Sequence, residues 1–478
     1  MIEYDSLVNR TVRRIKPSGI RKFFDIANEM DDVISLSVGE PDFHTPWHIR
    51  DAGIYSLERG HTKYTSNAGM LELRREIANY LRRRFDLEYD YTNQILVTVG
   101  GSEAIDLCVR TLIEPGDEVL IPEPSFVCYV PITEMAGGVP VIIETKPENG
   151  FRLTAQELEE KITDKTKLLI LPYPNNPTGA VMRRADLEAI AQVVERHNLL
   201  VLSDEIYAAL TYGSEPHTAF SAIPGMQERT ILVNGFSKSH SMTGWRMGYA
   251  AGPREIIGLM TKLHQFAIMS APTMSQYAAI EAMKNGDDDI EYMRGQYDMR
   301  RRLIVDGLNS MGLKCFEPEG AFYVFPSVKS TGLTSMEFCE RLIRSHRVAV
   351  VPGDAEEREL SVLDDRFLSS PSLALERAHD AVVQMSEFAR DNYRLAVELI
   401  WKFDAKKLER LNETEVALDK LEGLLDNYLV KLTDRALTAE ESTRVSELLH
   451  TLSDFERIGD YAVNVSESAV VLHDRNIT

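Results

Sequence analysis

The sequence predicts an α/β protein with a doubly wound, mostly parallel sheet, followed by an all-helical segment. In the first 360 residues, short apolar runs alternate with helical patterns at a spacing of about thirty residues, as in strand–helix–strand units of a buried parallel sheet. Turn-forming residues then nearly disappear, because residues 361–478 hold 2 of the 28 glycines and 1 of the 20 prolines. Such a segment has few connections, so we expect long helices there.

The expected strands are short apolar runs bounded by turn residues. They cover residues 94–99, 166–173, 199–205 and 230–236, and helical spacing is clearest over 185–197. Parallel strands joined by helices have their carboxyl ends at one edge of the sheet. Open α/β sheets bind their ligands at that edge, so functional residues are expected there.

The tail carries three stripes of apolar residues at three- and four-residue spacing, which predict three amphipathic helices. Thr438 and Glu441 have the spacing of a capping box and predict the start of the third helix. Three such helices with short turns form an antiparallel bundle, and residues 351–372 are the expected junction. The stripes are Val382, Met385, Ala389, Tyr393, Ala396 and Ile400; Leu408, Leu411, Leu418, Leu421, Leu425 and Leu432; and Val445, Leu448, Leu452 and Phe455.

Composition excludes several classes of partner. The balance of 53 Lys+Arg against 74 Asp+Glu gives a net charge of −21, which argues against nucleic acid and anionic membrane surfaces. No apolar run is long enough to span a bilayer, and the first residues lack the apolar core of a signal peptide. The four cysteines are scattered without a CxxC pair, as expected for reduced thiols. These features predict a cytoplasmic protein without membrane insertion.

Polar residues follow three of the predicted strands where each strand ends. The turn 175–179 (Asn-Asn-Pro-Thr-Gly) follows the first, Asp204 and Tyr207 lie at and after the end of the second, and Lys238 and Arg246 follow the third. Taken singly, each is a weak signal: a turn, a helix cap or a solvated lysine explains it equally well. Because all three strand ends meet at one edge, we expect these side chains to share one crevice.

The combined set suits an aldehyde-bearing pyridine with a phosphate, which is pyridoxal phosphate (PLP). A lysine in a dry site can form an imine, and a carboxylate can keep a pyridine nitrogen protonated. An arginine and free backbone N–H groups suit a phosphate. Gly100, Gly101 and Ser102 follow the run 94–99 and open a helical stretch, so they predict a phosphate-binding helix N-terminus.

The segment 237–246, SKSHSMTGWR, closely resembles the PLP-lysine signature of class I/II aminotransferases, which have fold type I. The resemblance covers about residues 10–353 and implies a large, mostly parallel sheet domain with a smaller second domain. Expected boundaries are 1–45 and 286–358 for the small domain, which is expected to be truncated, and 46–285 for the large one. The other matching stretches are SVGEPDF (37–43), YTSNAGMLELR (64–74), YPNNPTG (173–179) and LSDEIY (202–207).

The resemblance implies a role for each matching residue. Lys238 would form the Schiff base with the cofactor and later carry the α-proton of the substrate. Asp204 would pair with the pyridine nitrogen, and Tyr207 and Asn176 would hydrogen-bond the phenolic oxygen of the ring. The residues expected to hold the phosphate are Gly101, Ser102, Ser237 and Arg246.

Three further residues complete this expected site. Phe126 would stack on the cofactor ring, although its shape alone also suits a core phenylalanine. Gly39 would offer its backbone to the substrate carboxylate. Tyr64 would reach the phosphate in the neighbouring subunit, which implies a homodimer.

The implied activity is that of a PLP-dependent aminotransferase, with a PLP-dependent lyase as the nearest alternative. An amino acid would leave as its 2-oxo acid, and a second 2-oxo acid would take up the amino group. The sequence departs from the family after Asp354, where no strand with an arginine for the substrate carboxylate follows. Arg358 and Arg366 are candidates only by default. A second hypothesis is therefore a catalytically impaired PLP-binding relic whose working part is the tail, acting as a phosphate-regulatory or interaction module.

The tail resembles the PhoU-like cytoplasmic helical part of sodium/phosphate cotransporters. LDDRFLSSPSLALERA (363–378) and SDFERIGDYAVNVSE (453–467) carry this resemblance, which covers about residues 362–471 of an expected bundle at 362–478. PhoU-like domains carry Glu-x-x-x-Asp pairs that can bind a metal ion, divalent or ferric, and this spacing puts both carboxylates on one helix face. Solvated carboxylates, or pairs with Lys420 and Arg457, are the alternative. The matching pairs are Glu415 with Asp419 and Glu456 with Asp460.

Overall fold

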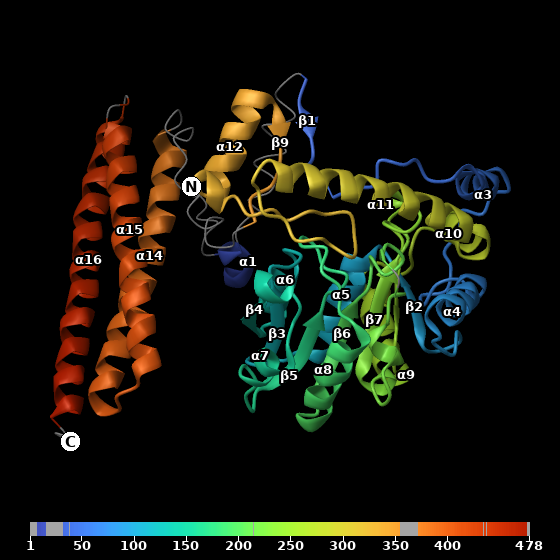
Figure 1. The fold of residues 1–478 in the computed structure, drawn as a ribbon, viewed down its shortest axis with the longest axis horizontal. Helices are drawn as coiled ribbons and strands as arrows, with labels where there is room; N and C mark the ends of the chain where they lie inside the picture. The colour runs from blue at the N-terminus through green and yellow to red at the C-terminus, as the bar shows by residue number, and fades with distance from the viewer. Residues whose placement is uncertain are drawn as a thin grey trace. The chain divides into compact units, whose positions relative to one another are not determined.

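The computed structural model describes residues 7–15, 32–37, 39–213, 215–353, 371–433, 435 and 437–475. The chain divides into two compact units, Met1–Gly353 and Asp354–Thr478. The first unit is the expected α/β part, and the second consists of helices joined by short connections (Figure 1).

A seven-stranded sheet forms the centre of the first unit, in the order β2-β8-β7-β6-β5-β3-β4. All neighbours are parallel except β8, which pairs antiparallel with both β2 and β7. The four predicted strands are all present, as β2, β5, β6 and β7, and β5, β6 and β7 lie side by side. The strands are β2 (Ile95–Thr98), β3 (Glu118–Glu123), β4 (Val139–Glu144), β5 (Thr166–Leu171), β6 (Leu200–Asp204), β7 (Thr230–Gly235) and β8 (Gly248–Ala251).

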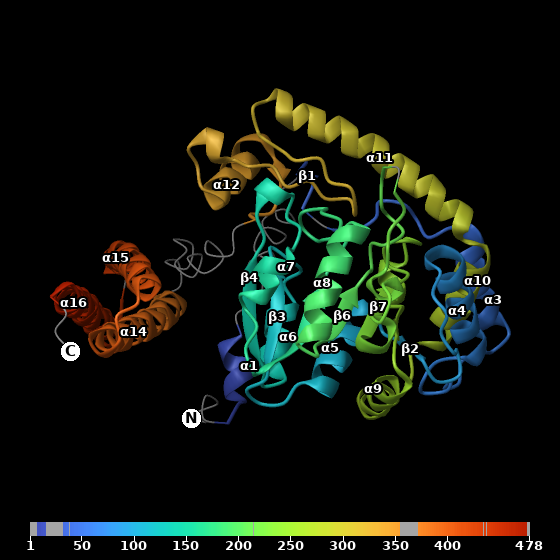
Figure 2. The same cartoon turned by 60° about the horizontal axis from the view of Figure 1, so that its bottom comes forward.

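Helices cover both faces of this sheet because its buried strands are apolar on both sides. Leu168 and Ile170 of β5 face α5 and α9, whereas Leu169 and Leu171 face α8. Figure 2 shows α8 beside β6 and α4 near the β2 edge. The helices of this unit are α1 (Arg10–Arg14), α3 (Trp47–Glu58), α4 (Leu71–Phe85), α5 (Gly101–Leu112), α6 (Tyr129–Met135), α7 (Ala155–Glu159), α8 (Arg184–Arg196), α9 (Arg254–Ala267), α10 (Thr273–Asn285), α11 (Asp287–Ser310) and α12 (Ser335–His346).

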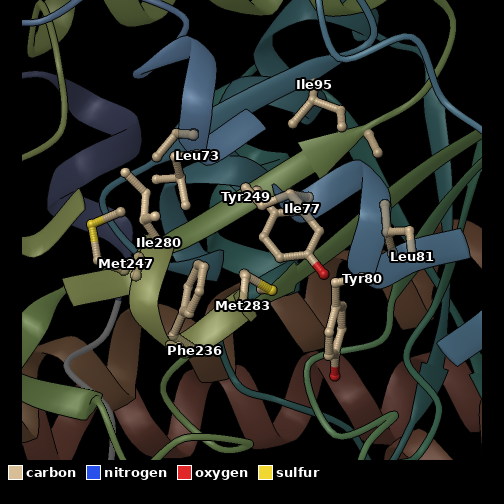
Figure 3. Packing of buried hydrophobic residues seen from close by; sticks show 14 of the residues in the cluster. Leu73, Ile77, Tyr80, Leu81, Ile95, Phe236, Met247, Tyr249, Ile280 and Met283 are labelled. Atoms are coloured by element: carbon tan, nitrogen blue, oxygen red, sulfur yellow. The ribbon is translucent and has the colours of Figure 1, made fainter. Parts of the chain in front are cut away.

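The largest apolar cluster joins α3, α4 and α10 to the β2–β8 side of the sheet. Tyr249 of β8 is fully buried there, and Figure 3 shows its ring close to Ile77 of α4. A second, two-stranded parallel sheet pairs β1 (Ile34–Ser35) with β9 (Val348–Ala349). This pairing brings a segment near the N-terminus to the last residues of the first unit.

The second unit consists of three long helices, α14 (Pro371–Trp401), α15 (Ala405–Thr433) and α16 (Ala439–Asp474). The predicted capping box is present: Thr438 accepts from the Glu441 N–H, and the Glu441 carboxylate accepts from the Thr438 N–H. Each of the three helices contributes apolar residues to a shared core. None of the described helices combines the length and hydropathy needed to cross a membrane.

The predicted stripe of the first tail helix is wrong at two positions. Tyr393 and Ile400 are 41% and 39% exposed, whereas Asn392 and Leu399 are buried. The buried face continues through residue 392, where the sequence has a polar side chain. A prediction from apolar spacing therefore selects the adjacent Tyr393, although Tyr393 faces outward.

Candidate active site

The predicted site residues meet at the carboxyl ends of β5, β6 and β7. Register brings the strand ends together, since Leu171 pairs with Ser203 and Asp204 with Val233. Asp204 is the last residue of β6, and Lys238 lies three residues beyond β7. The expected shared crevice is therefore present in the fold.

Lys238 is held in a largely buried position with its amine facing polar and aromatic groups. Its Nζ donates a hydrogen bond to the Gly39 carbonyl oxygen (2.5 Å), and it lies 5.5 Å from the Phe322 ring centroid and 5.7 Å from that of Tyr207. Burial lowers the pKa of this amine to about 8, with Arg246 lowering it further and the Glu40 carboxylate opposing the shift. An amine with a lowered pKa is more often neutral and therefore a better nucleophile.

Asp204 is a buried carboxylate, only 6% exposed. Tyr129 donates its hydroxyl to Oδ2 (2.8 Å), and the Ile206 N–H donates to Oδ1 (3.2 Å). Burial raises the pKa of this carboxyl to about 6, although both hydrogen bonds lower it. A carboxylate in such a dry site has a strong need for a cationic partner, such as a protonated pyridine nitrogen.

Tyr207 is buried and its hydroxyl is hydrogen-bonded to that of Tyr323 (2.5 Å). Tyr323 also lies directly against Gly39, where an added Cβ would stand 2.3 Å from its hydroxyl oxygen. Gly39 thus has no room for a side chain, and its carbonyl is free to face Lys238. This arrangement places the predicted residues Tyr207, Gly39 and Lys238 around one point.

A glycine cradle lies at the N-terminus of α5. Gly100 has φ +81°, and a Cβ on it would stand 2.8 Å from the Arg246 guanidinium. A Cβ on Gly248 would stand 2.4 Å from the Gly100 carbonyl carbon. The backbone and guanidinium therefore approach closely beside the free N–H groups of the first helical turn, which suits a phosphate. Gly101 and Ser102 begin this turn, so the cradle fits the phosphate of PLP.

The other predicted contacts occupy the expected region. Asn175 holds its turn, because its Oδ1 accepts from the N–H (3.1 Å) and hydroxyl (2.7 Å) of Thr178; the adjacent Asn176 is half-buried. Ser237 is buried beside Lys238. Phe126 is partly buried and meets Tyr129 edge-on, with ring centroids 5.9 Å apart.

Three residues of the site were not predicted from the sequence: Tyr129, Phe322 and Tyr323. Tyr129 lies three residues after Phe126, in the segment 124–129 (PSFVCY). Because Phe126 was expected at the cofactor ring, the sequence could have predicted that Tyr129 lies near the same ring. Phe322 and Tyr323 come from a stretch without strand or helix pattern, and Ala321, with φ +57°, precedes them. No local pattern indicates that this stretch returns to Lys238.

An open cavity of about 560 Å³ lies next to this group of residues. Its lining includes Glu40, Asp42, His44, Ser241 and Thr243, which flank Gly39 and Lys238 in sequence. Residues close in sequence to Gly39 and to Lys238 therefore border one space large enough for a small molecule.

The aminotransferase class I and II family model matches residues 31–359. This chain belongs to the class I and II aminotransferases. It is accordingly a PLP-dependent transaminase of fold type I, as the sequence motifs implied.

Relatives of this aminotransferase cover the same region. A Bacillus subtilis protein named as an aminotransferase, YugH, is 48% identical over 384 residues, 80% of this chain and 98% of that protein. The aspartate aminotransferase of Pyrococcus abyssi is 46% identical over 71% of this chain and 88% of its own length. The solved aspartate aminotransferase of Thermus thermophilus with maleate matches with a TM-score of 0.70 at 38% identity, covering 72% of this chain and 91% of that one.

The tail of the aminotransferase matches the PhoU domain model at residues 382–469, which confirms the second resemblance.

Glu415 and Glu456 have raised pKa values. Burial raises that of Glu415 to about 7, helped by Asp419, Asp460 and Glu456, whereas a hydrogen bond from Asn392 (3.2 Å) lowers it.

The predicted metal site of the tail is not supported. Among the described residues, no group of three or more His, Cys, Asp or Glu side chains is arranged to hold a metal ion. Asp419 and Asp460 are exposed. Burial and the carboxylates of Asp460, Glu422 and Asp419 raise the pKa of Glu456, and Arg457 opposes this shift. Arg358 and Arg366, the default candidates for the substrate arginine, lie outside the described residues.

Proposed function

We propose that Lys238 is the catalytic residue of this aminotransferase and Asp204 the partner of the cofactor ring. The observation that carries this proposal is the meeting of both residues at one edge of the sheet: Asp204 ends β6, and the Lys238 amine is hydrogen-bonded to Gly39 beside the Tyr207 ring. Burial there lowers the pKa of the lysine to about 8 and raises that of the carboxyl to about 6. When bound, PLP supplies an electron sink that stabilises negative charge at the α-carbon of the substrate. With the cofactor in place, Asp204 would keep the ring nitrogen protonated, and Lys238 Nζ would take the α-proton of the substrate.

The remaining residues orient the cofactor. Tyr207 and Asn176 hydrogen-bond its phenolic oxygen, and Phe126 packs against its ring. The phosphate is held by Gly101, Ser102, Ser237 and Arg246. The closeness of Arg246 to Gly100 supports this assignment, since it puts a cation beside free helix N–H groups.

The substrates are an amino acid and a 2-oxo acid. The substrate carboxylate meets the backbone of Gly39, next to the Lys238 amine. Relatives named as aspartate and aromatic-amino-acid aminotransferases make aspartate, tyrosine and phenylalanine the first donors to test. The proposed domains are 1–45 with 286–358, then 46–285, then the bundle at 362–478.

The functional form is a cytoplasmic homodimer in which Tyr64 completes the phosphate site of the partner subunit. Tyr64 lies just before the turn that contains Gly69, near β2. Its side chain is 83% exposed. Trp47 of α3 and Phe266 of α9 are also 62% and 80% exposed, and each is an apolar side chain that a second copy could cover.

Spectroscopy of the purified full chain with PLP tests this proposal. We expect a yellow enzyme whose absorbance changes to that of the pyridoxamine form when an amino acid donor is added. Lys238→Ala should retain some PLP but lose turnover by at least about 1,000-fold, because the variant lacks the amine that is proposed to carry the proton. Full activity in that variant would overturn the assignment. We do not favour the relic, which would bind PLP without ever converting it.

A further inference from the structure

The first turn of α5 carries a carboxylate that none of these roles uses. Glu103 is the third residue of α5, next to the glycine cradle. Its Oε2 accepts a hydrogen bond from the Val99 N–H (2.5 Å), and its Oε1 lies 2.8 Å from Nδ1 of His264 on α9. One side chain thus connects the end of β2, the start of α5 and the last turn of α9.

Among the described residues, the His264 side chain is hydrogen-bonded to Glu103 alone. Its side chain is fully buried, and its Nε2 has no hydrogen-bond partner in the described part of the chain. A buried N–H without an acceptor is costly, so the ring proton belongs on Nδ1, which donates to Glu103. The imidazole therefore fixes the direction of the carboxylate.

The direction matters because the N–H groups of the first turn have no partner within the helix. An acidic residue at the third helical position commonly reaches back to a backbone N–H just before the helix. A carboxylate at this position that has no fixed partner can also turn to the free N–H groups of the first turn. In α5 these donors are the ones that face a phosphate, and Gly100 has no side chain to occupy them. Both Glu103 oxygens are held elsewhere, so the N–H groups remain available.

We propose that His264 and Glu103 are positioning residues for the cofactor phosphate. His264 holds the carboxylate away from the N–H groups of the first turn, and Glu103 fixes the turn that carries them. This inference rests on the PLP site proposed above. Both residues act through the cradle and not on the reacting atoms.

The test compares binding of PLP and of pyridoxal, which lacks the phosphate, to the full-length apoprotein by absorbance titration. H264L should raise the Kd of PLP about tenfold but that of pyridoxal by less than about twofold, since only phosphate contacts are affected. H264N keeps a donor near the Nδ1 position and should bind PLP within about threefold of the wild type. E103A should also weaken PLP binding selectively.

The two residues should behave as one unit. In an E103A background, H264L should change the Kd of PLP by less than about twofold, because His264 then has no carboxylate to direct. The pair His197–Glu159, with Nε2 and Oε1 2.6 Å apart, lies between α7 and α8 and offers a matched control. H197L should leave both dissociation constants unchanged.

Equal losses of PLP and pyridoxal binding in H264L, or no loss of either, would overturn the proposal. So would a tenfold effect of H264L in the E103A background. If H264L does not fold, as melting of the apoprotein shows, selective loss of PLP binding in E103A supports the proposal and its absence overturns it. A wild-type chain that binds neither ligand would instead contradict the proposed function itself.

Discussion

At the residue scale, burial acts on Lys238 and Asp204 in opposite directions. It lowers the pKa of the lysine to about 8 and raises that of the carboxyl to about 6. In each case burial disfavours the charged form. Near neutral pH the amine is thus more readily deprotonated than an ordinary lysine, and the carboxylate gains more from a cationic partner. Burial at the same site therefore favours a neutral amine at Lys238 and a cationic partner for Asp204.

Asp204→Asn should separate binding from chemistry. An amide cannot hold the ring nitrogen protonated, so we expect the rate of half-transamination to fall about 100-fold or more. PLP affinity should change less, because the phosphate cradle does not include this residue. Single-turnover absorbance measurements give the rate and a titration gives the affinity. A rate within threefold of the wild type would contradict the role of Asp204.

At the element scale, the approach of β8 to the α5 turn leaves no room for a methyl group. Gly248→Ala puts a Cβ 2.4 Å from the Gly100 carbonyl carbon, which is backbone and cannot rotate away. We expect a loss of about 1–3 kcal/mol in the free energy of unfolding and weaker PLP binding. Gly258→Ala in α9 meets nothing within 4 Å and is the control. Denaturant unfolding of both variants checks this, and equal effects would contradict it.

The sequence predicted those elements whose local pattern and tertiary environment agree. β5, β6 and β7 are continuous apolar runs, and the polar residues at their ends correctly indicated that Asn176, Asp204 and Lys238 share one sheet edge. Tyr323 was missed because it reaches the site through an irregular stretch, which leaves no periodic signal. Asn392 was missed for the opposite reason, since its burial is set by packing and its side chain is polar.

The helical unit should become more stable as the pH falls from 8 towards 5. The pKa of Glu415 is raised to about 7 in the folded chain, above its usual value of 4.5. A raised carboxyl pKa stabilises the fold below the unfolded value, and this contribution is lost as the pH rises through about 7. Glu415→Gln should therefore add about 1 kcal/mol at pH 8, a value that allows for partial exposure, and little at pH 5.

Hydrogen exchange of residues 405–433 in the full chain measures this effect at both pH values, after correction for the intrinsic pH dependence of exchange. Glu398 is the control, because it is exposed and its pKa is lowered by Lys407. Glu398→Gln should not stabilise the bundle at pH 8. Loss of protection at pH 8 in Glu415→Gln would contradict the prediction.

At the scale of the whole molecule, a shared site predicts complementation between two inactive variants. If Tyr64 serves the partner subunit, Tyr64→Ala and Lys238→Ala each damage every site of their own homodimer. In a mixed dimer, one site keeps Lys238 and receives an intact Tyr64. Refolding an equal mixture should restore about a quarter of wild-type activity, the share expected from random pairing. Activity no higher than the mean of the two separate variants would argue against a site shared between subunits.

The hydrogen bond between Lys238 and Gly39 joins residues 199 positions apart. Closing so long a loop costs chain entropy, which other contacts of the fold must offset before this hydrogen bond forms. During refolding, the lysine environment should form after the local helices and the sheet. The recovery of the cofactor absorbance then reports the last step of folding. It should be slower than the recovery of the helical circular dichroism signal.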